Sequence, residues 1–119
     1  YLTDQPDRFL AAELIREKIL RFAEQEVPHA AAVAIESWED TGKLIRIAAT
    51  IYVERAGQKA ILIGAGGGAL KKIGTEARQD LEKSLGRKVF LQTLVKVRPN
   101  WREDPDFLGA IDWRSGPGM

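Results

Sequence analysis

Residues 44–54 constrain the fold of this chain more than any other segment. The residues on one side of this stretch, taken as an extended chain, are all apolar: Ile45, Ile47, Ala49, Ile51 and Val53. A period of two with one wholly apolar side predicts a strand in a sheet that buries a single face. Residues 31–38 predict a second strand. The turn-forming residues Glu39 to Gly42 lie between the two strands and favour a hairpin.

The rest of the chain supplies helices to cover that face. Residues 7–25 and 69–85 carry apolar side chains at helical spacing. Gly86 is a natural end for the second of these helices. Residues 103–111 predict a short closing helix.

Residues 88–98 predict a third strand, which Pro99 ends. Its inward side chains are expected to be Val89, Leu91, Thr93, Val95 and Val97. Together the predicted elements give an α+β fold in which a three-stranded sheet packs against helices.

The length of 119 residues corresponds to one domain. We expect the folded domain to occupy residues 7–112, preceded by a linker at 1–6 and followed by a flexible tail at 113–119. The chain has no cysteine and a single histidine, which excludes disulfides, thiol catalysis and a zinc site built on several histidines. No apolar run is long enough to predict a membrane span.

The net charge of +1 conceals an uneven distribution of charged residues. Residues 1–54 carry six Lys/Arg and ten Asp/Glu, whereas residues 55–100 carry ten and three. Residues 101–119 are acidic again. A compact basic segment inside a nearly neutral chain indicates a face that binds a polyanion, although a solvated basic surface would have the same composition.

The basic segment contains the run Gly64-Ala65-Gly66-Gly67-Gly68, which opens the predicted helix at 69–85. Glycine-rich backbone at a helix N-terminus presents N–H groups and the positive end of the helix dipole to an anion. The missing side chains allow a phosphate or a base to approach the backbone closely. Lys71 and Lys72 follow at once.

Three kinds of glycine loop compete for this segment. The Walker A pattern is excluded, because no glycine here is followed by Lys-Ser or Lys-Thr. The dinucleotide fingerprint G-x-G-x-x-G/A matches residues 64–69. However, it requires an acidic residue at the end of the next strand, and that strand ends in the basic sequence Val95-Lys96-Val97-Arg98.

The third kind is the G-x-x-G loop of KH domains, which lies between two helices and clamps single-stranded nucleic acid. Gly64-Ala65-Gly66-Gly67 supplies it. Gln58 to Ile63 would then form a short helix despite its strand-like composition. The element order becomes helix, strand, strand, helix, GxxG, helix, strand, which is that of a type II KH domain.

Several short motifs extend the KH pattern along residues 3–112. They are Arg16-Glu17-Lys18-Ile19, Glu26-Val27-Pro28-His29, Val53-Glu54-Arg55, Gly57-Gln58-Lys59, Ile61-Leu62-Ile63-Gly64, Leu70-Lys71-Lys72-Ile73-Gly74, Ala77-Arg78, and Val95-Lys96-Val97 with Trp101-Arg102. In order and spacing the chain resembles the C-terminal KH domain of the Era family of GTPases.

The resemblance implies a domain that binds the 3′ end of 16S ribosomal RNA during assembly of the 30S ribosomal subunit. It implies that residues 1–6 are a linker from an N-terminal GTPase domain, which would be a partner within the same polypeptide. GTP and magnesium would belong to that domain. This chain would have no enzymatic activity, cofactor, metal or small-molecule substrate, and its location would be cytoplasmic, with a peripheral position at the inner membrane face also implied.

Ten residues are the candidates for RNA contact. They are Gly64, Ala65, Gly66, Gly67, Lys71, Lys72, Lys59, Arg78, Ile63 and Ile73. The glycine loop and the lysines would hold phosphates, Lys59 and Arg78 would flank the strand, and the two isoleucines would floor a groove for bases. Core packing is the alternative role for the isoleucines, and a solvated or paired helix position is the alternative for Arg78.

One departure from the family concerns the middle of the loop. Family members usually carry a Lys or Arg there, whereas this chain has Ala65 and Gly66. Three functions therefore stay open: an RNA-binding module, a KH-shaped interaction domain that has lost RNA binding, and a dinucleotide-binding fragment. A helix before the glycine loop favours KH, and a strand before it favours dinucleotide binding.

Overall fold

The computed structural model describes residues 5–22 and 31–111. The elements are α1 (Gln5–Phe22), β1 (Ala32–Asp40), β2 (Leu44–Val53), α2 (Ala56–Ile63), the 3-10 turn η2 (Ala65–Gly67), α3 (Gly68–Leu85), β3 (Lys88–Val97), the 3-10 turn η3 (Trp101–Glu103) and α4 (Pro105–Ile111). This order confirms the predicted α+β, type II KH arrangement. A helix, not a strand, precedes the glycine loop.

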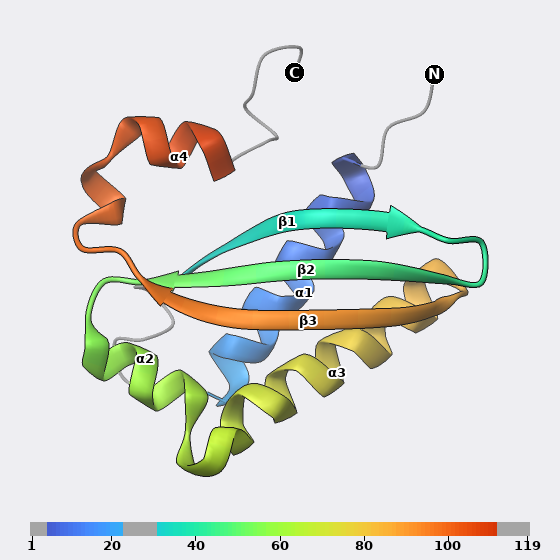
Figure 1. Cartoon of the computed structure of the whole chain (residues 1–119), viewed down its shortest axis with the longest axis horizontal. Helices are drawn as coiled ribbons and strands as arrows, with labels where there is room; N and C mark the ends of the chain where they lie inside the picture. The colour runs from blue at the N-terminus through green and yellow to red at the C-terminus, as the bar shows by residue number, and fades with distance from the viewer. Residues whose placement is uncertain (1–4, 23–30, 112–119) are drawn as a thin grey trace.

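The three strands form one sheet in the order β1-β2-β3 (Figure 1). The first two run antiparallel and make the predicted hairpin, while β3 runs parallel to β2. Ile45 pairs with Val89 and Ile51 with Val95, so the apolar positions of the two strands lie side by side on one face. Since β3 is last in the strand order, it forms one edge of the sheet.

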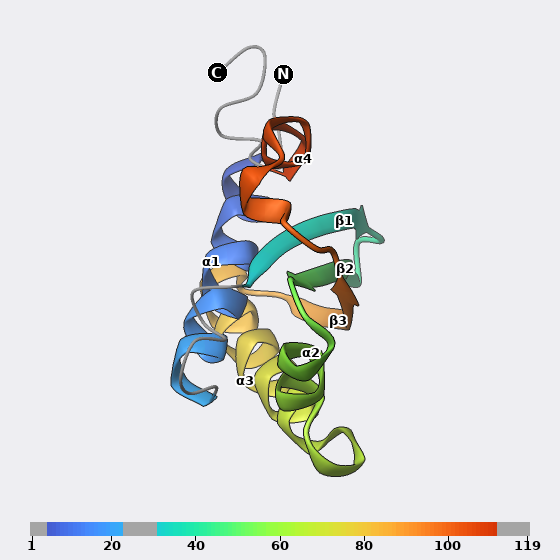
Figure 2. The ribbon, with the colours of Figure 1, turned by 90° about the vertical axis from the view of Figure 1, so that its left-hand side faces the viewer.

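Helices α1 and α3 cover that apolar face, and Figure 2 shows them on the same side of the sheet. The core between these helices and the sheet contains five residues with no exposed surface: Ile15 and Ile19 of α1, Ile51 and Val53 of β2, and Ala77 of α3. Burying side chains of this kind stabilises a fold by roughly 1.5–3 kcal/mol each. Both helices are therefore fixed relative to the sheet.

An ion pair between a buried lysine and a partly exposed aspartate also joins α1 to α3. Lys18 is only 3% exposed, and its ammonium group donates hydrogen bonds to Asp80 of α3 and to Glu17. The hydrogen bond from Lys18 holds the pKa of Asp80 below its ordinary value. Asp80 does not line the groove along α3 that is described below.

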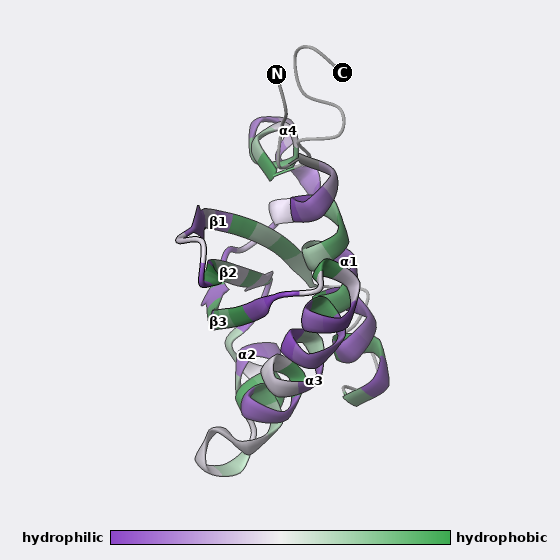
Figure 3. Ribbon diagram, turned by 90° about the vertical axis from the view of Figure 1, so that its right-hand side faces the viewer, coloured by the Kyte–Doolittle hydropathy of each residue, from purple (hydrophilic) through white to green (hydrophobic). Residues whose placement is uncertain are grey.

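The other face of the sheet is covered only at one end. Trp101 of η3 and Phe107 of α4 are buried there with Ala32 of β1, and the Phe107 ring meets Tyr52 edge to face at 4.8 Å between centroids. Figure 3 shows α4 above the β1 edge of the sheet, and α1 and α3 together on one side of the strands. We call the uncovered part the outer face.

The structure differs from the sequence prediction at several element boundaries. Helix α1 begins at Gln5, inside the expected linker, and β1 continues through Asp40, where Arg87 pairs with the Asp40 carboxylate at 2.6 Å. The closing helix is broken into η3 and α4 at Asp104. Residues 1–4, 23–25 and the tail at 113–119 lie outside the described residues.

Val97 lies on the predicted inward side of β3, on the same face as Val95 and opposite the buried Val53, but it is 38% exposed at the end of the strand. In residues 5–22 and 31–111 no helix combines the length and apolar character needed to span a bilayer.

Candidate nucleic-acid interface

The glycine loop is held between two helices. Gln58 of α2 is 6% exposed, and its side-chain oxygen accepts hydrogen bonds from the backbone N–H groups of Glu54 and Arg55, both at 2.9 Å. These two hydrogen bonds fix the start of α2. The helix ends at Gly64, whose N–H donates to the carbonyl of Ala60 at 2.9 Å, and the chain then turns through η2 into α3.

Three glycines of this loop adopt positive φ angles, which most side chains disfavour. The φ angles of Gly64, Gly66 and Gly67 are 74°, 60° and 78°. At Gly64 there is a second requirement, because an added Cβ would lie 2.7 Å from the Cβ of Ala69 and 2.9 Å from its N. The sequence is therefore glycine-rich here partly for reasons of local folding.

The outer side of the loop is open. A Cβ added to Gly66, Gly67 or Gly68 would meet no heavy atom within 4 Å. Gly67 is the N-cap of α3, no side chain caps it by a hydrogen bond, and the first turn of α3 contains no acidic residue. An anion can therefore reach the N–H groups and the positive dipole at this helix end.

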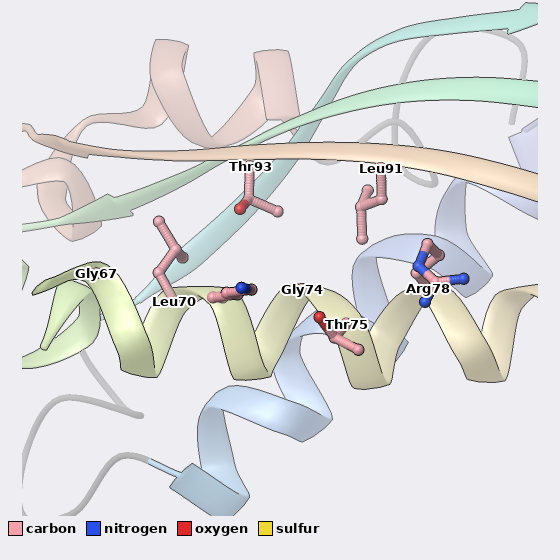
Figure 4. A pocket seen from close by; sticks show the side chains of 8 residues that line it. Gly67, Leu70, Gly74, Thr75, Arg78, Leu91 and Thr93 are labelled. Atoms are coloured by element: carbon pink, nitrogen blue, oxygen red, sulfur yellow. The ribbon is translucent and has the colours of Figure 1, made fainter.

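A groove runs from this loop along α3 and beneath the sheet edge. It has a volume of about 320 Å³ and is lined by Gly67, Leu70, Lys71, Gly74, Thr75 and Arg78 from the loop and α3, and by Leu91 and Thr93 from β3. Figure 4 shows Leu91 and Thr93 pointing from β3 toward α3. The floor is mixed apolar and polar, which suits a flat ring with hydrogen-bonding edges.

The structure separates the two lysines that follow the loop. Lys71 lines the groove. Lys72 is also exposed, but its ammonium nitrogen lies 5.0 Å from the centre of the Phe22 ring, so it faces α1. Lys71 is thus placed to contact a nucleic-acid chain bound in the groove. Lys72 would contact such a chain only where the chain extends past the loop toward α1.

Arg78 lies at the end of the groove away from the glycine loop. Its guanidinium donates to the Glu82 carboxylate at 3.0 Å, and the other oxygen of Glu82 accepts the N–H of Val89 at 3.0 Å. One carboxylate therefore ties Arg78 to the start of β3. Lys59 lies on α2, half-buried and outside the groove lining.

The two predicted isoleucines belong to the core and not to the groove lining. Ile73 is 1% exposed and packs with Ile51 and Leu62, and Ile63 is half-buried against the same cluster. Ile73 cannot touch a base without unfolding of the helix around it. The apolar groove contacts come instead from Leu70 and Leu91.

Five groove residues are not among the ten candidates from the sequence: Leu70, Gly74, Thr75, Leu91 and Thr93. The sequence did carry a signal at Gly74, because a glycine inside a helix costs about 1 kcal/mol relative to alanine and usually has a packing or functional reason. The strand residues carried no such signal. Their place beside α3 depends on the parallel pairing of β3 with β2.

We predict that Gly74→Leu blocks the groove without harming the fold. A Cβ at position 74 would lie 3.8 Å from the Thr93 hydroxyl, an ordinary contact, but the rest of a leucine side chain would fill the space below β3. RNA affinity should fall at least tenfold while the melting temperature stays equal or rises, since leucine favours helix.

Gly74→Ala is the matched control for that variant, because its single methyl group fits the space. The pair is measured by oligonucleotide titration and thermal melting. Equal affinity of the leucine variant and the unmodified chain would contradict a role for the groove.

The loop and the groove together offer the chemistry of a binding site. Within residues 5–22 and 31–111 no group of three or more His, Cys, Asp or Glu side chains could hold a metal ion. The loop offers backbone N–H groups and the groove offers apolar and hydroxyl surface. This combination suits the phosphates and bases of a single strand.

Comparison with known proteins supports this assignment. The KH domain family model matches residues 26–102. GTPase Era of Lactobacillus helveticus is 54% identical over 114 residues, which cover 94% of this chain and 38% of that protein. GTPase Era of a Nostoc species is 49% identical, covering 95% of this chain and 35% of the relative. The chain thus spans little more than a third of these relatives.

Solved structures agree with the sequence relatives. A variant of Aquifex aeolicus Era bound to GDP and aluminium fluoride superimposes with a TM-score of 0.85 at 41% identity, covering 94% of this chain and 38% of that one. Era in complex with MgGDPNP and nucleotides 1506–1542 of 16S ribosomal RNA gives a TM-score of 0.86 with the same identity and coverage. The resemblance to the KH domain of Era GTPases is confirmed, and this chain belongs to the KH domain family.

Proposed function

We propose that this chain binds single-stranded RNA in the groove between α3 and β3. The proposal rests on one observation: the open glycine loop and the groove are continuous with each other. Gly67 belongs to both, so a phosphate on the loop places the next bases against Leu70 and Thr93. A KH site of this size accommodates about four nucleotides.

In this proposal the loop binds phosphate through its backbone. The middle positions Ala65 and Gly66 carry no charge, so the N–H groups at the start of α3 and the nearby Lys71 supply the attraction. Contacts of this kind hold the strand in register, whereas the base edges facing β3 determine sequence preference.

The RNA we propose is the 3′ end of 16S ribosomal RNA, with a role in assembly of the 30S ribosomal subunit. Support comes from the similar Era structure that contains nucleotides 1506–1542 of 16S ribosomal RNA. We further propose that a GTPase domain of the same polypeptide is a partner and that GTP and magnesium belong to it. The proposed location is cytoplasmic, with peripheral association at the inner membrane face.

The experiment that tests RNA binding is a titration with five-nucleotide RNAs tiled across that ribosomal segment, at several salt concentrations. We predict measurable affinity for at least one pentamer. The slope of log affinity against log salt concentration should correspond to only a few neutralised phosphates, because a short strand displaces few counterions. Sequence preference should persist as salt is raised. Failure of every pentamer to bind would favour the interaction-domain alternative.

A further inference from the structure

The outer face of the sheet lies directly across β3 from the groove. Successive residues of a strand point to opposite sides, so Leu91 and Thr93 line the groove while Phe90 and Gln92 lie on the outer face. Because β3 is the edge strand, no further strand separates the two surfaces. A chain leaving the groove over this edge therefore arrives at Phe90 and Gln92.

The outer face contains a hollow of about 320 Å³ at this point, lined among others by Arg46, Phe90 and Gln92. Its origin is the cross-strand row Ser37–Ala48–Gln92, which combines two small side chains with one long one. The neighbouring row is Glu39–Arg46–Phe90. The small side chains of Ser37 and Ala48 leave the hollow open, and it is bordered by the ring of Phe90 and the amide of Gln92.

Phe90 is available for stacking. Its side chain is 42% exposed, and the Arg46 guanidinium carbon lies 5.1 Å from the centre of its ring. An aromatic ring with a neighbouring guanidinium is the combination on which unpaired bases stack, whatever their sequence. The side-chain amide of Gln92 can both donate to and accept from a base edge.

The charges on this face favour a path along β3. Lys88 and Lys96 are exposed on the same side of the strand as Phe90 and Gln92, by the alternation of the strand. The acidic side chain at the hollow, Glu39, comes from the far strand β1 and meets Arg46 at 3.8 Å. A polyanion is therefore attracted to the β3 side of the face.

We propose that the outer face is a second contact surface for single-stranded RNA, in which nucleotides that continue beyond the groove stack on Phe90 and lie in the hollow beside Gln92. The inference rests on the proposed function, since it needs a strand in the groove. It adds that the chain binds longer single strands more tightly than the groove alone allows.

The test compares short and long probes. The five-nucleotide RNA that binds best is extended by seven nucleotides at its 5′ end or at its 3′ end. We expect one extension to raise affinity at least tenfold. Phe90→Ala should remove most of that gain, about tenfold for one lost stacking contact, while leaving the pentamer affinity unchanged.

Two further variants make the result specific. Phe90→Trp keeps a stacking surface and should retain the gain from the longer probe. Leu20→Ala removes another exposed apolar side chain, 51% exposed on α1, and should change neither affinity. Thermal melting of each variant checks that the fold is intact.

The outcomes separate this inference from the proposed function. If no pentamer binds, the proposed function fails and the inference falls with it. If the pentamer binds but neither extension adds affinity, or if Phe90→Ala reduces short and long probes equally, only the inference is overturned. A change in sedimentation of the Phe90→Ala chain without a change in RNA affinity would overturn it in favour of self-association.

Discussion

Replacing both Gly66 and Gly67 by aspartate should reduce RNA affinity by at least a hundredfold and leave the chain folded. Both positions face open space at the start of α3, where the proposed phosphate approaches. Each carboxylate would repel a phosphate at about 4 Å by roughly 1–4 kcal/mol, depending on how well water screens the pair. The added side chains would also keep the strand away from the backbone.

The cost to stability should be small. The φ angles of 60° and 78° are unfavourable for most side chains, but aspartate is among the residues that tolerate them best. An acidic residue near a helix N-terminus also interacts favourably with the helix dipole. We expect a loss of about 1–2 kcal/mol, measured by thermal melting beside circular dichroism.

The matched control is the double asparagine variant, with side chains of the same shape and no charge. It should weaken RNA binding far less than the aspartate pair. The difference between the two variants separates the charge repulsion of phosphate from the steric effect of the added side chains. Unchanged affinity in the folded aspartate variant would show that the glycine loop is not the binding site, although the KH fold would stand.

Gly64→Ala should destabilise the whole domain, in contrast to the other loop glycines. The backbone of Gly64 has φ 74° and ψ 177°, a region that is almost exclusive to glycine and costs other residues about 1–3 kcal/mol. The new Cβ would also lie 2.7 Å from the Cβ of Ala69, a distance that real Cβ atoms do not sustain. We expect a combined loss of roughly 2–4 kcal/mol.

A loss of that size should lower the melting temperature by roughly 10 °C or more, since 1 kcal/mol corresponds to about 4–8 °C in a small domain. Gly57→Ala is the matched control, because Gly57 lies in α2 in open space and without a positive φ, so alanine should be neutral or stabilising. Adding Ala69→Gly to the Gly64 variant removes one of the two close contacts and should restore part of the stability.

A Gly64→Ala chain that melts at the temperature of the unmodified chain would contradict the close packing of the α2–α3 turn. RNA affinity gives a second readout, because a displaced loop should weaken binding even at a temperature where the variant is folded. The two loop experiments thus distinguish a glycine that the fold needs from glycines that the proposed ligand needs.

The element pattern could be predicted from sequence because it depends on local periodicity. The alternation at residues 44–54 fixed which face of β2 is buried, and the glycine at position 86 marked the end of α3 with a φ of 67°. The position of the glycine loop at the start of α3 followed from the same kind of evidence. Such features depend on neighbours a few residues away.

The short helix α2 shows where local evidence was insufficient. Ile61-Leu62-Ile63 has the composition of a strand, and only its place in the KH order favoured a helix. In the structure Leu62 is buried in the core, while Gln58 holds the start of the helix by bonding two backbone N–H groups. Tertiary contacts outweighed the intrinsic preference of a three-residue run.

Which side chains line the groove depends on the tertiary structure. Lys71 and Lys72 are adjacent in sequence, yet a rotation of about 100° per residue turns one to the groove and the other to Phe22 of α1. Ile73 looked equally suitable and is buried, because its side of α3 faces the sheet and α2.

By itself the sequence determined the two long helices, the three strands, the family and the glycine loop, because all of these depend on the spacing of residues along the chain. The groove wall contributed by Leu91 and Thr93, and the outer face that carries Phe90, exist only because β3 pairs in parallel with β2 at the sheet edge. That pairing joins segments about forty residues apart. No local pattern specifies it, and so only the folded chain could show which residues share a surface.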